Sequence, residues 1–265
     1  MATLNGHAAQ DDPRNDLVLE FARFVRGLRP KALMMEDVPG LAKDKRTEQL
    51  VADLEEMGYC CTQDVLDAAD YGVPQRRRRF ILLAGRGVKI AFGRPARRRR
   101  SVREALRRLG RRARRDPLHN MPEEHTAKVM EIIRLIPKDG GSRLDLGPAH
   151  QLACHRRCDG FKDVYGRMEW DEVAPTITGG CCNPSKGRFL HPVRDRTITL
   201  REAALLQTFP SSYFFSLRRG KFSAAQMIGN ALPPEFIKRH AKSIIRSLKK
   251  SSAGRLQRGR SNARY

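Results

Sequence analysis

The first 86 residues alternate helix-like and strand-like segments, and this order restricts the fold more than any other feature of the sequence. The helix-like segments carry apolar side chains on one face, and the strand-like segments are short apolar runs bounded by turn residues. In chain order the segments are residues 15–28 (helix), 31–38 (strand), 47–57 (helix), 59–66 (strand) and 79–84 (strand). Helices and strands in this order are typical of α/β domains, in which helices cover a sheet.

The helix predicted over residues 15–28 has a regular apolar pattern. Leu17, Phe21, Phe24 and Leu28 follow one another at spacings of 4, 3 and 4 residues, which lines one helical face. Pro30 ends this helix, because proline disfavours helical backbone in the residue before it.

Several later segments show helix starts. Ser101 with Glu104 and Thr199 with Glu202 fit capping boxes, and Ser223 with Gln226 has the same spacing. Residues 236–248 carry apolar side chains at helical spacing, which predicts a helix with one face in the core. His240 lies on that face, and we expect it to be packed rather than catalytic.

The chain carries 52 Lys and Arg residues against 29 Asp and Glu residues, a net charge of +23. An excess of this size favours a polyanionic partner, and nucleic acid is the first candidate. Residues 94–115 alone hold twelve Arg and one Glu. Two readings stay open here, a basic helix that binds nucleic acid and a solvated linker. The Arg bias (39 of the 52) is also what a GC-rich genome produces without any partner.

Other classes of protein are disfavoured by composition. No run of about 18 apolar residues is present to form a transmembrane helix, and residues 1–20 contain no apolar signal core, so we expect a cytoplasmic location. Six cysteines in a chain of this kind do not indicate a disulfide framework. Cys154-His155 with Cys158 lacks the second half of a zinc site, so we expect no metal.

Five strings of residues sharpen the functional prediction. They are residues 12–17 (DPRNDL), 35–40 (MEDVPG), 70–79 (DYGVPQRRRR), 196–210 (RTITLREAALLQTFP) and 228–234 (IGNALPP). In this order they closely resemble motifs of the cytosine-5 DNA methyltransferase family. The resemblance covers most of the chain.

The resemblance implies an α/β fold with two parts. Residues 1–86 would form the later half of a Rossmann-like sheet of a methyltransferase that depends on S-adenosylmethionine, and residues 87–192 a smaller, loop-rich target-recognition domain that includes the basic segment 94–115. Residues 193–248 would return to the catalytic domain. Residues 249–265 are basic and rich in Ser and Gly, and we expect a disordered tail there.

The resemblance also implies a reaction, the transfer of a methyl group from S-adenosylmethionine to C5 of a flipped cytosine in double-stranded DNA. Cytosine C5 is a poor nucleophile, so a thiolate must add at C6 while a carboxyl group binds N3. Glu36 occupies the family's carboxyl position, and Arg77 and Arg79 occupy positions that contact the flipped base. Alternation along an extended segment places Arg77 and Arg79 on one face. Gly229 and Asn230 match a late motif that helps to bind the cofactor.

Each of these residues also has a simpler reading. Glu36 could cap a helix or lie on the surface, the arginines could grip phosphate without touching a base, and Gly229-Asn230 could be a turn that ends a helix.

Two parts of the family's machinery are not found in the sequence. None of the six cysteines follows a proline, so the Pro-Cys-Gln nucleophile loop is absent, and so is the Gly-rich cofactor loop. We therefore weigh a subunit whose partner supplies the missing parts, a truncated or mis-started product, and a catalytically inactive basic DNA-binding protein. Glu36, Arg77 and Arg79 argue against the last, since a pure DNA binder needs no carboxylate beside the DNA.

Overall fold

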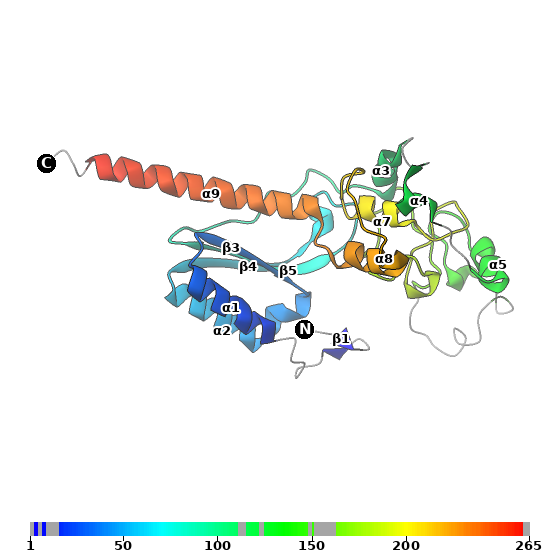
Figure 1. Cartoon of the computed structure of the whole chain (residues 1–265), viewed down its shortest axis with the longest axis horizontal. Coiled ribbons are helices and arrows are strands. Elements are labelled where there is room, and N and C mark those ends of the chain that lie inside the picture. Colours follow the sequence, from blue (N-terminus) through cyan, green and yellow to red (C-terminus); the bar gives the residue numbers. More distant parts are fainter. Residues whose placement is uncertain are drawn as a thin grey trace. The chain divides into compact units, whose positions relative to one another are not determined.

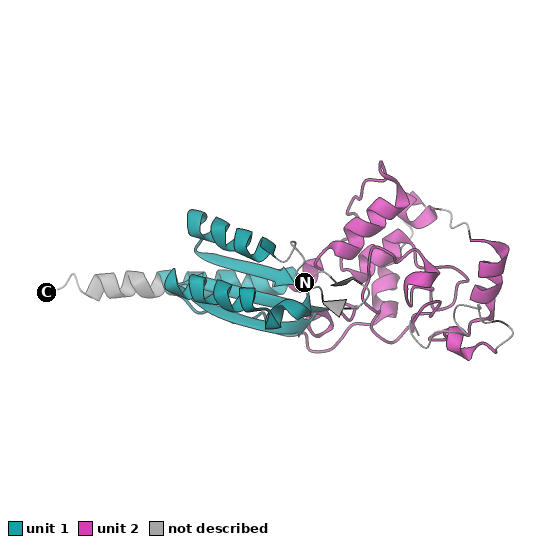
Figure 2. Cartoon of the chain, turned by 90° about the horizontal axis from the view of Figure 1, so that it is seen from below, with its two compact units in different colours: residues 1–67, 78–95, 237–265 teal, residues 68–77, 96–236 magenta. Residues whose placement is uncertain are grey.

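The computed structural model describes residues 3–4, 7–8, 16–110, 115–121, 125–147, 150 and 163–261. The chain is divided into two compact units, shown in different colours in Figure 2. The first unit contains residues 1–67, 78–95 and 237–265, and the second contains residues 68–77 and 96–236. Residues 193–236 therefore lie in the second unit with residues 96–192, whereas the resemblance assigns them to the catalytic domain.

The first unit is built on a three-stranded antiparallel sheet. Its strands are β3 (Ala32–Asp37), β4 (Tyr59–Asp67) and β5 (Arg78–Arg86), in the order β3-β5-β4. All three were predicted from the sequence and are confirmed. The central strand β5 is buried along most of its length because it has a neighbour on each edge and covered faces on both sides.

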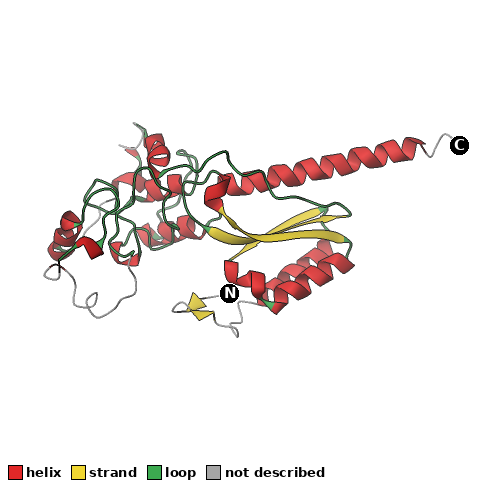
Figure 3. Cartoon of the chain, turned by 180° about the vertical axis from the view of Figure 1, so that it is seen from behind, coloured by secondary structure: helices red, strands yellow, loops and turns green. Residues whose placement is uncertain are grey.

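Two helices cover one face of this sheet, α1 (Leu17–Leu28) and α2 (Lys45–Glu56), and α9 (Pro234–Ser261) runs along the opposite face (Figures 1 and 3). Leu50 and Leu54 of α2 are buried against the sheet. α2 begins where Asp44 accepts a hydrogen bond from the backbone N–H of Arg46, a side-chain cap that satisfies a donor at the helix start. A short 3-10 helix, η2 (Pro39–Lys43), joins β3 to α2.

The face of α1 that is buried differs from the predicted one, which was the stripe of large apolar residues. Val18, Ala22 and Val25 pack into the core, and of the predicted stripe only Phe21 packs partly against it. Leu17, Phe24 and Leu28 are 66%, 58% and 75% exposed. The helix carries two apolar stripes with the same period, so periodicity alone does not decide between them. The stripe of smaller side chains faces the sheet, which lets the helix approach it closely.

The expected helix near the C-terminus is confirmed, and it is longer than predicted. α9 continues to Ser261, so residues 249–261 are helical where we expected a disordered tail, and residues 262–265 lie outside the described residues. Where the side chains of α9 are described, one face is buried and the other exposed, since Phe236 is fully buried but Ile237 and Ile245 are exposed.

His240 is packed as predicted. Its side chain is fully buried, and its Nδ1 accepts a hydrogen bond from the backbone N–H of Gly93 at 3.1 Å. Its ring meets that of Phe92 edge to face. Burial lowers the pKa of His240 to about 4, because the charged imidazolium loses its hydration there.

The second unit consists of short helices joined by long loops. Its α-helices are α3 (Val102–Leu106), α4 (Pro117–Asn120), α5 (Ala127–Leu135), α7 (Leu200–Leu206) and α8 (Gly220–Asn230). The described residues of this unit also form the 3-10 helices η3 (Ala68–Tyr71), η4 (Arg107–Leu109), η6 (Arg143–Asp145) and η8 (Pro184–Lys186). Two two-residue strands, β1 (Thr3–Leu4) and β2 (His7–Ala8), belong to the first unit.

The core of the second unit surrounds α7, in which all seven residues are buried. The capping boxes predicted at Ser101 and Thr199 are both formed. The start predicted at Ser223 is wrong, because α8 already begins at Gly220, without a side-chain cap.

The low pKa of His240 predicts a specific loss of stability in acid. The unfolded chain binds the proton near the ordinary histidine pKa of 6.5 and the folded chain only near 4, so stability present above pH 6.5 is lost as the pH falls toward 4. Integration over this window gives about 3 kcal/mol. The free energy of unfolding is measured with urea at pH 7 and at pH 4. From pH 7 to pH 4 we expect that of His240→Asn to fall by about 3 kcal/mol less than that of the unchanged chain. Equal losses in the two proteins would contradict this account of His240.

Candidate functional site

Glu36 lies near the end of β3, on the sheet face that α1 and α2 do not cover. Leu33 and Met35 of the same strand point into the core with those helices, so alternation turns Glu36 to the other face. The strand ends at Asp37, and Pro39 opens η2 directly afterwards. The side chain of Glu36 is 29% exposed and therefore accessible without being fully solvated.

Arg79 forms an ion pair with Glu36. The Nε atom of Arg79 lies 2.8 Å from Oε1 of Glu36, and both side chains are partly buried. Glu36 stands directly opposite Ile81 in the β3–β5 ladder, so Arg79 occupies the diagonal position two residues along β5 on the same face. The sheet register therefore holds a carboxylate and a guanidinium together at a strand end.

Arg77 belongs to the second unit and has a different environment. It is 3% exposed, and its Nη1 donates a hydrogen bond to the backbone carbonyl of Ile177 at 3.1 Å. Arg76 and Arg78 are exposed, so the expected alternation along this segment is confirmed. A common base-binding surface of Glu36, Arg77 and Arg79 stays a prediction.

Two buried glutamines hold the segment that carries Arg77. Nε2 of Gln75 donates to Oε1 of Gln207 at 3.0 Å, and Oε1 of Gln75 accepts from the backbone N–H of Ile177 at 2.9 Å. Nε2 of Gln207 in turn donates to the carbonyl of Ile228 at 2.7 Å and to that of Ala231 at 3.3 Å. Both glutamines are fully buried.

This glutamine network joins three of the strings singled out in the sequence, residues 70–79, 196–210 and 228–234. Sequence reasoning missed it, because a glutamine in a motif does not reveal which amide it faces. The only available signal was that Gln75 and Gln207 both stand inside strings with strong family resemblance.

Gly229 packs against the chain itself. A Cβ atom at Gly229 would lie 2.2 Å from the backbone N of Gly179 and 2.2 Å from the carbonyl carbon of Thr178. The close approach that requires glycine is therefore made by the backbone of residues 178–179. This packing accounts for the glycine, and a contact of Gly229 with S-adenosylmethionine stays a prediction. Asn230 is exposed at the end of α8, and a cofactor contact there stays a prediction.

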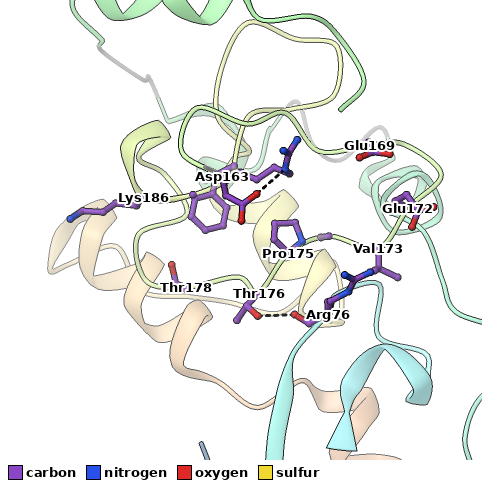
Figure 4. A pocket seen from close by; sticks show the side chains of 13 residues that line it. Arg76, Asp163, Glu169, Glu172, Val173, Pro175, Thr176, Thr178 and Lys186 are labelled. Atoms are coloured by element: carbon purple, nitrogen blue, oxygen red, sulfur yellow. Dashed lines mark hydrogen bonds and ion pairs between the residues drawn. The ribbon is translucent and has the colours of Figure 1, made fainter. Parts of the chain in front are cut away.

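A cavity of about 670 Å³ opens in the second unit beside Arg76 (Figure 4). Thr176 and Arg76 share one wall, where Oγ1 of Thr176 donates to the carbonyl of Arg76 at 2.7 Å. Glu169, Glu172 and Lys186 also line the cavity. These groups can donate hydrogen bonds to a polar ligand or accept them from it.

The environment of Cys61 does not activate its thiol. Burial, with a smaller contribution from Glu55, raises the pKa of Cys61 to about 11, which keeps its thiol protonated at neutral pH. Cys181 and Cys182 are buried in the core around α7. Cys154, His155 and Cys158 lie outside the described residues, as do residues 12–15 of the first string.

Neither a metal cluster nor a membrane span is found in the described part of the chain. No group of three or more His, Cys, Asp or Glu side chains there could hold a metal ion. Of the helices described, none has the length and apolarity needed to cross a bilayer.

Comparison with known proteins gives a consistent result. A family model described as C-5 cytosine-specific DNA methylase matches residues 4–246. The Type II methylase M.HgiDII of Herpetosiphon aurantiacus is 38% identical, over 88% of this chain and 69% of the relative. The Type II methyltransferase M1.BsuMI of Bacillus subtilis is 33% identical, over 87% of this chain and 55% of the relative. This chain thus spans between about half and about two thirds of the length of these relatives.

Solved structures share the fold. A protein described as a DNA modification methyltransferase encoded within an E. coli prophage superposes with a TM-score of 0.67 at 20% identity, over 90% of this chain and 76% of the other. The Dnmt2 methyltransferase of S. pombe gives a TM-score of 0.51 at 14% identity, over 92% of this chain and 74% of the other.

The glutamine network predicts a large effect of one substitution. Gln207→Leu removes the partner of Gln75 and leaves the carbonyls of Ile228 and Ala231 without their donor. Each buried polar group left unpaired costs about 1–3 kcal/mol, so we expect a loss of roughly 2–5 kcal/mol in the free energy of unfolding. Gln226→Leu on the exposed face of α8 is the control, with an expected change within about 0.5 kcal/mol. Similar losses in both variants, measured by urea unfolding, would show that the network does not hold these strings together.

Proposed function

This chain belongs to the C-5 cytosine-specific DNA methylase family, and on that premise we propose that it is a DNA (cytosine-5)-methyltransferase or the C-terminal part of one. The reaction is the transfer of a methyl group from S-adenosylmethionine to C5 of a cytosine flipped out of duplex DNA. The observation that carries the proposal is the pairing of Glu36 and Arg79 at the end of β3. Strand ends are where α/β sheets place their functional groups.

Glu36 supplies the carboxyl group that binds N3 of the flipped cytosine. When a thiolate adds to C6 of the ring, negative charge builds up and must be taken up at N3 by a proton or a strong hydrogen bond. The ion pair with Arg79 fixes the orientation of the carboxyl group before the base arrives. Arg79 is also suited to the carbonyl edge of the base, since a guanidinium presents several donors in one plane.

Arg77 lies in the second unit, and its surroundings there are well defined. Its hydrogen bond to Ile177 and the glutamine network beside it give the segment of residues 75–77 a fixed position. The contact of Arg77 with the flipped base, which its place in the family's motif implies, belongs to the same proposal. The finer architecture, a later half of a Rossmann-like sheet and a target-recognition domain within the second unit, belongs to the same proposal.

Two requirements of the reaction are met by groups outside these 265 residues. Methyltransferases of this family use S-adenosylmethionine as the methyl donor, and the sequence contains no Gly-rich cofactor loop. The sequence contains no Pro-Cys-Gln, and the pKa of the Cys61 thiol is raised rather than lowered. We propose that a further segment or a complementary methyltransferase subunit supplies the nucleophile and the cofactor loop.

Double-stranded DNA is the proposed macromolecular substrate, and the net charge of +23 supports it. A DNA substrate also agrees with the cytoplasmic location expected from the sequence.

A fusion experiment tests the role of Glu36. The part of M.HgiDII that this chain does not match is joined to this chain, and transfer of tritiated methyl groups to duplex DNA is measured. The chain alone should transfer none, and the fusion should be active. Glu36→Gln should lower the rate of the fusion by roughly 10²- to 10⁴-fold, the usual contribution of a general acid.

The control is Glu48→Gln, which removes an exposed carboxylate from α2 and should leave the rate unchanged. Full activity of the fusion with Glu36→Gln would rule out the proposed role. Methyl transfer by the chain alone would show that the missing parts are not needed.

A further inference from the structure

Residues 96–110 form a strongly basic surface segment of the second unit, called here the arginine segment. It contains seven arginines and one glutamate. Three of the arginines have acidic partners, in pairs that link Arg98 to Glu104 (2.7 Å), Arg99 to Asp70 (2.8 Å) and Arg103 to Asp171 (2.7 Å).

The arginine segment is held in place rather than being a solvated linker. Val102, Ala105 and Leu106 are buried in the core around α7. The capping box of Ser101 and Glu104 starts α3. Backbone N–H groups of Val102 and Arg103 donate to the carbonyls of residues 172 and 170 at 2.9 and 2.8 Å. The linker reading of the sequence is therefore wrong for this stretch.

The remaining four arginines form no ion pair at contact distance within the part of the chain that the structure describes. Arg97, Arg107 and Arg108 are exposed, and Arg100 is partly exposed. These four positive charges lie within twelve residues, and the only acidic groups near them in the described part of the chain are Glu104 beside Arg100 and Asp171 beside Arg107, which already form ion pairs with Arg98 and Arg103. Ion-paired arginines fix the backbone that carries these four. The arginine segment thus contains two groups of arginines. One group forms ion pairs that stabilise the segment, and the side chains of the other are available to a ligand.

We propose that Arg97, Arg100, Arg107 and Arg108 bind the phosphate backbone of duplex DNA outside the target base. The inference rests on the proposed function and adds a contact surface to it. A single small anion would neutralise only part of this charge, whereas a duplex presents a phosphate charge about every 1.7 Å along its axis. Contacts of this kind carry no sequence information and set the position of the protein on the DNA.

The experiment measures binding of the full chain to a duplex of random sequence at several salt concentrations. The variant carries Arg97→Gln, Arg100→Gln, Arg107→Gln and Arg108→Gln. Each phosphate contact contributes about 0.9 to the slope of log K against log salt, so the loss of four contacts should reduce the slope by about 3–4. We expect the binding constant at low salt to fall by at least about 10-fold.

The matched control removes four charges from α9, by Lys242→Gln, Arg246→Gln, Lys249→Gln and Lys250→Gln, all at exposed positions. It should change the slope by less than about 1. Equal slopes for the unchanged chain and the arginine variant, or equal reductions in variant and control, would overturn the inference. Tighter binding of the unchanged chain to single-stranded RNA than to duplex DNA would overturn it too. Failure of the unchanged chain to bind duplex DNA at all would instead contradict the proposed function.

Discussion

The ion pair between Glu36 and Arg79 depends on the register of the sheet, and the functional argument depends on that pair. Because Glu36 faces Ile81 across the β3–β5 ladder, Arg79 is its diagonal neighbour on the same face. A slip of one residue would turn Glu36 into the core, which the burial of Leu33 and Met35 prevents. The apolar core beneath α1 and α2 therefore fixes the position of the carboxyl group.

The same stretch of chain serves both units. Residues 75–77 belong to the second unit, where the glutamine network and Ile177 hold them, and β5 begins directly afterwards in the first unit. Because buried and exposed arginines alternate over residues 76–79, neighbouring arginine side chains have different surroundings and different partners. Arg77 is bound to backbone, Arg79 is bound to a carboxylate, and Arg76 and Arg78 face solvent.

The number of arginines overstates the charge that is free to bind DNA. Arg167 is fully buried and donates to the carbonyls of Ile133, Ile136, His191 and Arg194. Arg196 forms a two-bond ion pair with the buried Glu202, at 2.7 and 2.8 Å. In a unit with long loops, such arginines satisfy carbonyl groups that a regular helix or sheet would otherwise pair. The arginine segment differs because four of its members form no ion pair at contact distance within the described ranges.

Local patterns in the sequence predicted the elements well, and partners distant in the chain were harder to predict. Apolar runs located β3, β4 and β5, and the capping boxes at Ser101 and Thr199 formed as their spacing indicates. The exposed stripe of α1 was not foreseeable, because two apolar faces compete in one helix. The close packing of Gly229 on residues 178–179, fifty positions away in the chain, was likewise not indicated by the sequence.

A double-mutant cycle on Glu36 and Arg79 tests the central claim most directly. Methyl transfer by the fusion is measured for Glu36→Gln, Arg79→Gln and the double variant. If the two side chains act as one unit on the flipped base, the double variant should be about as slow as the slower single variant, with a coupling energy of at least about 1 kcal/mol. The account would be contradicted if the losses in activation free energy of the two single variants added up in the double variant. It would also be contradicted if Arg79→Gln transferred methyl groups as fast as the unchanged fusion.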